Sequence, residues 1–99
     1  MKEDVLLREI HEAVAEYERL IGGYASYTHQ MLDRLGPVVA VSKLVSDSKI
    51  QKGLKTLARA NRLDLSFEAV VIRHSQYFSR SVVEAAQWRL EKAKQGDFS

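Results

Sequence analysis

The sequence predicts an all-α protein, a compact orthogonal bundle of five to six helices. Apolar residues recur at intervals of three and four along most segments, as on one face of an α-helix, and no stretch alternates long enough for a strand. Glycine, proline and serine residues stand where these segments begin or end. The 99 residues, 45% hydrophobic and 28% charged, suit one globular domain.

The first expected helix spans residues 1–21 and ends at Gly22 and Gly23. It is acidic, with six acidic and three basic side chains. Its apolar positions follow the i, i+4, i+7, i+8 spacing of an amphipathic helix. They are Leu6, Ile10, Ala13, Val14, Tyr17 and Ile21.

Gly36 and Pro37 separate the second expected helix from the third. The second begins near Ser26 or Thr28 and stops at Gly36, because glycine suits the left-handed turn after a helix. Pro37 then opens a short third helix through Leu44, since a proline in the first helical turn loses no hydrogen bond.

Two further helices are expected from N-terminal capping signals. Ser48 and Gln51 have the spacing of a capping box, and this box opens a fourth helix that runs to about Asn61. After a short turn, Asp64 or Ser66 caps a fifth helix.

The sixth expected helix is capped by Ser79 or Ser81. Ser81 and Glu84 have the spacing of a second capping box. Trp88 lies about 140° around this helix from its apolar side, so the helix cannot bury both in one place. Burial of Trp88 against the opposite face of the first helix is the favoured interpretation. The alternative makes Trp88 an exposed anchor for a protein partner, together with Arg89 and Tyr77.

Basic residues gather in one part of the chain, where residues 43–62 carry six basic side chains and one acidic side chain. On the fourth helix they fall within an arc of about 140°, opposite Ile50, Leu54 and Leu57. Such a surface binds phosphates or an acidic partner, or serves only as a solvated face. This basic series consists of Lys49, Lys52, Lys55, Arg59 and Arg62.

The third and fourth helices invite comparison with a helix-turn-helix, whose second helix enters the major groove of DNA. The usual turn glycine is absent, however, and Gly53 stands where the second helix would need a core residue. Short helix pairs are also common in small helical domains. Major-groove recognition is therefore disfavoured.

The sequence lacks recognisable equipment for catalysis. The absence of cysteine removes thiol chemistry and cysteine metal sites, and the three histidines are too scattered for a metal centre. Neither a nucleophile elbow nor a phosphate-binding loop is present. We therefore expect no enzymatic activity, no cofactor, no metal and no small-molecule substrate. With no apolar run of membrane-spanning length and no signal-peptide pattern, a cytoplasmic protein is expected.

Five segments of the sequence, taken in order, carry a resemblance to other proteins. They are residues 27–32, 36–41, 53–57, 62–71 and 78–90. This order resembles a small helical module found in bacterial proteins, alone or beside larger domains. The resemblance covers residues 24–94 and implies a helical fold without functional residues.

The expected organisation is a single domain over residues 1–95, with the acidic helix at 1–21, a helical core at 24–94 and a frayed tail at 96–99. Its expected function is that of a non-enzymatic interaction module of a bacterial or phage cytoplasmic system, acting through protein contacts or self-association as a dimer. The alternative is a nucleic-acid-binding accessory or regulatory protein that uses the basic series.

Overall fold

The computed structural model describes residues 2–47 and 51–97, which form six α-helices, two 3₁₀ helices and no strand. The predicted all-α bundle is therefore confirmed. In chain order the elements are α1 (Lys2–Ile21), α2 (Ser26–Leu35), α3 (Pro37–Ser46), α4 (Gln51–Arg59), η2 (Leu63–Leu65), α5 (Phe67–Arg73), η3 (Ser75–Tyr77) and α6 (Arg80–Lys94).

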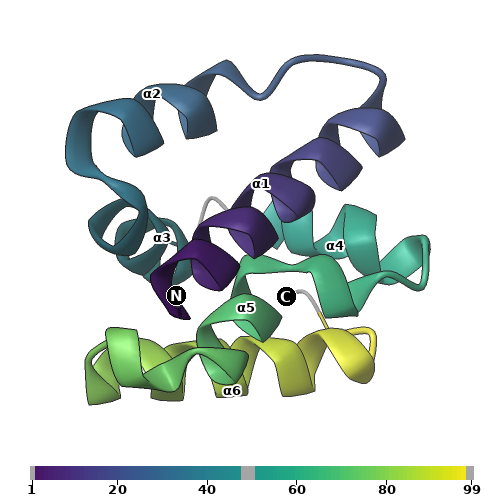
Figure 1. Cartoon of the computed structure of the whole chain (residues 1–99). Coiled ribbons are helices and arrows are strands. Elements are labelled where there is room, and N and C mark those ends of the chain that lie inside the picture. The colour runs from purple at the N-terminus through teal and green to yellow at the C-terminus, as the bar shows by residue number, and fades with distance from the viewer. Residues whose placement is uncertain (1, 48–50, 98–99) are drawn as a thin grey trace.

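The long helix α1 crosses the middle of the molecule, with α2 on one side of it and α6 on the other (Figure 1). α5 packs against α6 and α1, while α2 packs against α3. α4 lies against the second half of α1 and also contacts α6. α3 contacts α2 on one side and α5 and α6 on the other, so it joins the two sides of the bundle.

The core forms where α1, α3, α5 and α6 meet. Its centre includes Ile10 from α1, Val41 and Val45 from α3, and Val70 and Val71 from α5, all fully buried. α3 and α5 are too short to persist alone, so burial of these valines supplies most of their stability.

Helix boundaries agree closely with the local signals. Gly36 has a left-handed φ of 81°, and Pro37 occupies the first turn of α3. Ser66 caps α5, its Oγ accepting from the Ala69 amide at 3.1 Å. Ser79 caps α6 in the same way, so the predicted Ser81–Glu84 capping box is wrong.

The ends of the short helices differ modestly from expectation. α3 continues two residues beyond Leu44, and α4 ends at Arg59, just before Asn61 with its φ of 58°. The predicted Ser48–Gln51 capping box lies outside the described residues. After α6, the Asp97 amide donates to the Lys92 carbonyl at 2.9 Å.

Within residues 2–47 and 51–97, no helix combines the length and the apolar character needed to cross a membrane.

Candidate functional site

A pocket of about 360 Å³ opens between the second half of α1, the α1–α2 loop and α4. Its lining is mostly apolar, because α1 and α4 both turn hydrophobic side chains toward it. Tyr17 comes from α1, Leu54 and Leu57 come from α4, and Phe67 comes from the start of α5. Sequence reasoning did not predict this pocket, because its walls are distant in the chain.

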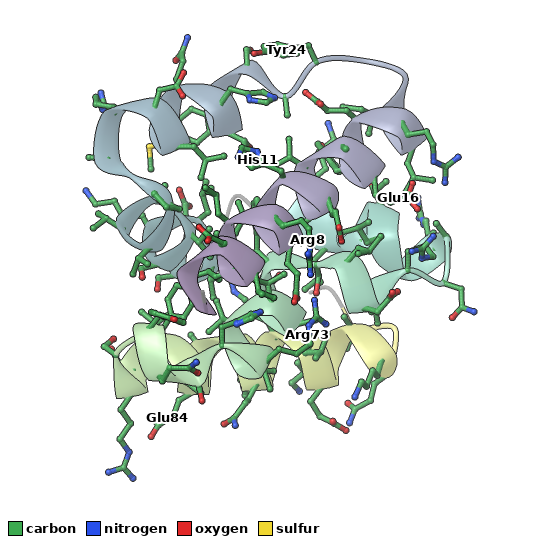
Figure 2. All side chains as sticks on the ribbon, in the orientation of Figure 1. Arg8, His11, Glu16, Tyr24, Arg73 and Glu84 are labelled. Atoms are coloured by element: carbon green, nitrogen blue, oxygen red, sulfur yellow. The ribbon has the colours of Figure 1, made fainter. Side chains whose placement is uncertain are left out.

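Three large apolar side chains stand exposed at the rim of the pocket. They are Ile21, Tyr24 and Tyr27, with exposed fractions of 44%, 70% and 59%. Figure 2 shows Tyr24 on the α1–α2 loop, at the outer edge of the molecule. Clustered exposed aromatic groups beside a pocket are typical of binding surfaces.

The α1–α2 loop is fixed by Glu18. Its carboxylate accepts a hydrogen bond from the Ala25 amide at 2.8 Å and lies 3.0 Å from His29 Nε2. The Ala25 amide in particular holds the pKa of Glu18 below its usual value, although burial opposes the shift. Tyr24 stacks on the His29 ring, with centroids 4.4 Å apart. The rim is thus held in place before any ligand arrives.

Arg89 lies inside the molecule, with only 8% of its surface exposed. Its guanidinium donates to the Asp47 carbonyl at 2.5 Å and to the Leu44 carbonyl at 3.4 Å, both at the end of α3. Arg89 is therefore a structural residue, and its predicted place on an exposed protein interface is wrong.

Glu68 is buried beside Arg89 and contributes to the lining of the pocket. Arg89 Nη1 lies 3.5 Å from Glu68 Oε2, and the two groups form an ion pair. Oε2 accepts no hydrogen bond from the described residues. Burial raises the pKa of Glu68, and the hydrogen bond from its own backbone amide and the Arg89 charge oppose that rise only in part.

Three members of the predicted basic series form an exposed surface on α4. Lys52 and Arg59 are exposed and Lys55 is half-buried, and none forms an ion pair within the described residues. We call these three residues the basic stripe. Lys52 also lines the pocket, so the basic stripe borders it. Lys49 lies outside the described residues.

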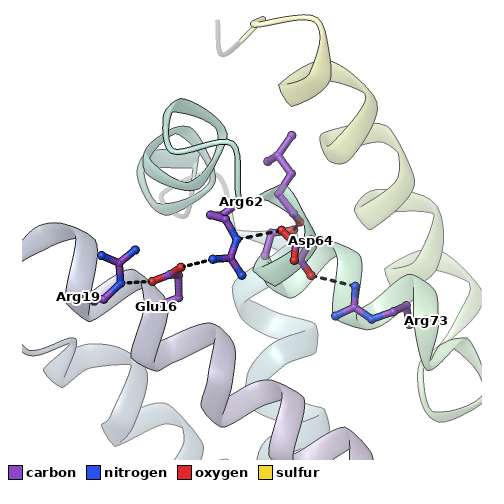
Figure 3. A network of polar contacts seen from close by, with 7 residues as sticks. Glu16, Arg19, Arg62, Asp64 and Arg73 are labelled. Atoms are coloured by element: carbon purple, nitrogen blue, oxygen red, sulfur yellow. Dashed lines mark hydrogen bonds and ion pairs between the residues drawn. The ribbon is translucent and has the colours of Figure 1, made fainter.

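Arg62, the last member of the predicted basic series, is not part of the basic stripe because it pairs with acidic residues of its own chain. Its Nη1 donates to Glu16 Oε2 at 2.8 Å, and Glu16 also accepts from Arg19 at 2.5 Å. The network continues through Asp64, whose carbonyl accepts from Arg73 (Figure 3). The hydrogen bond from Arg19 chiefly holds the pKa of Glu16 below its usual value. Part of the acidic first helix is thus neutralised by this chain's own arginines.

Trp88 is 59% exposed, so its favoured burial against α1 is wrong. The Lys92 ammonium lies 5.6 Å from the centre of its ring. Tyr77 instead packs partly buried against the core. Since Arg89 is buried as well, Tyr77, Trp88 and Arg89 do not form one exposed surface, and none of them lines the pocket.

A second polar cluster joins α1 to the end of α5. The Glu9 carboxylate accepts from Arg73 Nε at 2.8 Å and lies 3.0 Å from His74 Nε2. Burial tends to raise the pKa of Glu9, but the contacts with His74 and Arg73 outweigh it and hold the pKa below 4.5. The ionised form of Glu9 therefore stabilises the packing of α1 on α5.

We expect Glu9→Gln to lower the free energy of unfolding at pH 7 and to matter progressively less in acid. Because the folded pKa is the lower one, the stabilisation is present above the unfolded value of 4.5 and disappears as pH falls through the folded value. Urea unfolding followed by circular dichroism at pH 7, 5, 4 and 3 measures the difference. Glu12→Gln, at an exposed carboxylate of the same helix, is the control. An equal difference at pH 7 and pH 3 would contradict this assignment.

Glu68 was not predicted as a site residue either, although the sequence carries a signal for it. Phe67 to Ile72 is apolar except for this one carboxylate, which therefore enters the core with the helix. Its partner Arg89 could not be found in the same way, because it follows in a different helix.

No family model, no curated protein and no solved structure matches the chain. The functional argument therefore depends on the geometry of the pocket and its surroundings.

Proposed function

We propose that this chain is a non-enzymatic protein-interaction module whose pocket receives an acidic, amphipathic segment of a partner protein. The observation that carries the proposal is the convergence of three exposed apolar side chains on an open apolar pocket bordered by the basic stripe.

The apolar part of the surface favours a protein segment. Tyr24 and Tyr27 offer large rings with polar tips, the side chains that most often supply binding energy at protein interfaces. The pocket behind them accepts an apolar side chain from a partner. Because Glu18 already holds the loop, binding costs little ordering of the rim.

The basic stripe favours an acidic partner. At 100° per residue, Lys52, Lys55 and Arg59 fall within an arc of about 60° on α4. A helix or extended segment that places apolar groups in the pocket brings its flanking side chains past Lys52. Acidic groups there gain attraction and faster association, both of which weaken with salt.

Nucleic-acid binding is the alternative, and the same three cations favour it. The withdrawal of Arg62 into contact with Glu16 reduces the cationic surface available to phosphates. The apolar rim, moreover, has no role in phosphate contacts. We therefore place nucleic acid second.

A designed 16-residue amphipathic peptide of leucine and glutamate tests the proposal. We expect it to bind the chain, whereas a scrambled peptide and a lysine version do not. Titrations at low and high salt, followed by fluorescence anisotropy, give the affinities. Tyr24→Ser/Tyr27→Ser should weaken binding at least about tenfold, as expected for hot-spot aromatics. Reversing the basic stripe to glutamate should weaken peptide binding and invert its salt dependence, because salt then screens a repulsion.

Trp88→Ser is the matched control, because it removes an exposed aromatic side chain away from the pocket. It should leave peptide affinity unchanged. Equal binding of the lysine peptide, equal loss in Trp88→Ser, or tighter binding of random duplex DNA than of the acidic peptide would each overturn the proposal.

A further inference from the structure

The buried carboxylate of Glu68 is only partly satisfied by the folded chain. Its side chain is 3% exposed, and Oε2 receives no hydrogen bond from the described residues. A buried oxygen without a donor is costly and uncommon in folded proteins. Because Glu68 is one of the residues that line the pocket, the missing donor indicates what a bound group should supply.

In its present position Arg89 makes an ion pair with Glu68 but no hydrogen bond to Oε2. Its two terminal nitrogens are directed to the carbonyls of Leu44 and Asp47, which end α3. The remaining approach to Glu68 is the 3.5 Å ion pair. Since helix carboxyl ends attract cations, α3 and Glu68 compete for the same guanidinium.

The lining of the pocket selects the kind of group that carries the donor. Tyr17 and Phe67 present rings and Leu54 and Leu57 present aliphatic surface, so an aromatic ring packs well there. A cationic group reaching Glu68 would lie close to the Arg89 guanidinium and be repelled by it. An uncharged donor avoids that repulsion.

We infer that the partner segment anchors itself in the pocket through a tyrosine or tryptophan side chain whose O–H or N–H donates to the Glu68 carboxylate. This inference rests on the proposed function and names the partner's anchor residue. Both side chains combine a large apolar body with one polar tip, as the pocket requires. Because Oε2 is covered in the free chain, the incoming ring displaces a lining side chain as it enters.

Three small aromatic probes isolate the hydrogen bond. They are p-cresol, which donates, 4-methylanisole, which only accepts, and toluene, which does neither. Each is titrated into the isotopically labelled chain, and amide shifts at Gly53 and Leu57 report on the pocket. We expect p-cresol to bind about tenfold more tightly than 4-methylanisole, the usual effect of a hydrogen bond to a charged acceptor. Benzylammonium, the cationic probe, should bind more weakly than p-cresol.

Glu68→Met removes the acceptor while keeping the shape of the side chain. It should remove the preference for p-cresol and leave toluene affinity within about twofold. Glu84→Met, at an exposed carboxylate of α6, should keep the preference. If Glu68→Met does not fold, the ratio of p-cresol to 4-methylanisole in the unaltered chain decides the matter.

The outcomes separate this inference from the proposed function. Equal binding of p-cresol and 4-methylanisole, stronger binding of benzylammonium, or no shift at the pocket with any probe would overturn the inference. Binding of the acidic peptide, and its loss in the rim variant, remains a separate measurement. A peptide that binds while the probes show no donor preference would leave the docking surface standing and remove only the anchor.

Discussion

Arg89→Met is expected to lower the free energy of unfolding by about 3–5 kcal/mol, because it leaves a buried carboxylate without its cation. The change removes the ion pair to Glu68 and the hydrogen bonds to the two carbonyls at the end of α3. Total stabilities are typically about 5–15 kcal/mol, so the loss is a large share. Urea unfolding followed by circular dichroism measures it.

Two variants establish that the charge of Glu68 causes this loss. Arg89→Met/Glu68→Met should recover part of the stability, since replacing both charges removes the unpaired one. Arg80→Met, whose arginine pairs with Glu84 on the surface of the same helix, should change stability by no more than about 0.5 kcal/mol. If Arg89→Met is as stable as Arg80→Met, Arg89 does not hold the fold together.

Ile10→Ala is expected to cost about 2–5 kcal/mol, which is the usual range for truncating a fully buried isoleucine. Ile10 is completely buried at the centre of the core, where α1 meets the valines of α3 and α5. The cavity would weaken the packing of α1 against both α3 and α5. Thermal and urea unfolding should report the same destabilisation.

Leu7→Ala provides the comparison for Ile10→Ala, because Leu7 lies on the same helix but is 41% exposed. Its loss should be no more than about 1 kcal/mol. Similar losses at the two positions would contradict the orientation of α1.

The helices could be predicted from the sequence because their signals are local. Gly36 and Pro37 mark a boundary by backbone conformation alone, and Ser66 marks another through its own side-chain hydrogen bond. The choice between Ser79 and Ser81 was harder. Both serines precede an apolar turn, and only the packing of α6 determines which of them becomes its first cap.

The candidate site could be predicted only in part, because its contacts join distant positions. Arg89 is held in the interior by hydrogen bonds to carbonyl groups more than 40 residues earlier in the chain. Because Arg89 faces inward on α6, its neighbour Trp88 lies on the exposed side. The sequence pattern favoured burial of Trp88 against the first helix of a compact bundle. The buried side of α6 instead follows Val82, Ala86, Arg89 and Ala93.

The uneven distribution of charge is visible in the sequence. Which of these charges pair with one another in the fold is not. Glu16 and Arg62 are 46 positions apart, and their pairing depends on how α1 packs on the end of α4. The same packing leaves Lys52 beside the pocket. One part of the basic series thus stabilises the fold while another part stays available on the surface.

The position of Trp88 determines which optical signals can follow this protein. As the single tryptophan of the chain, and one already in contact with solvent, it changes its surroundings little on unfolding. Its emission is therefore a poor indicator of folding. As the single tryptophan, Trp88 is also a suitable energy donor to a dye on a docked peptide, since its emission falls when the labelled peptide binds and recovers when it leaves.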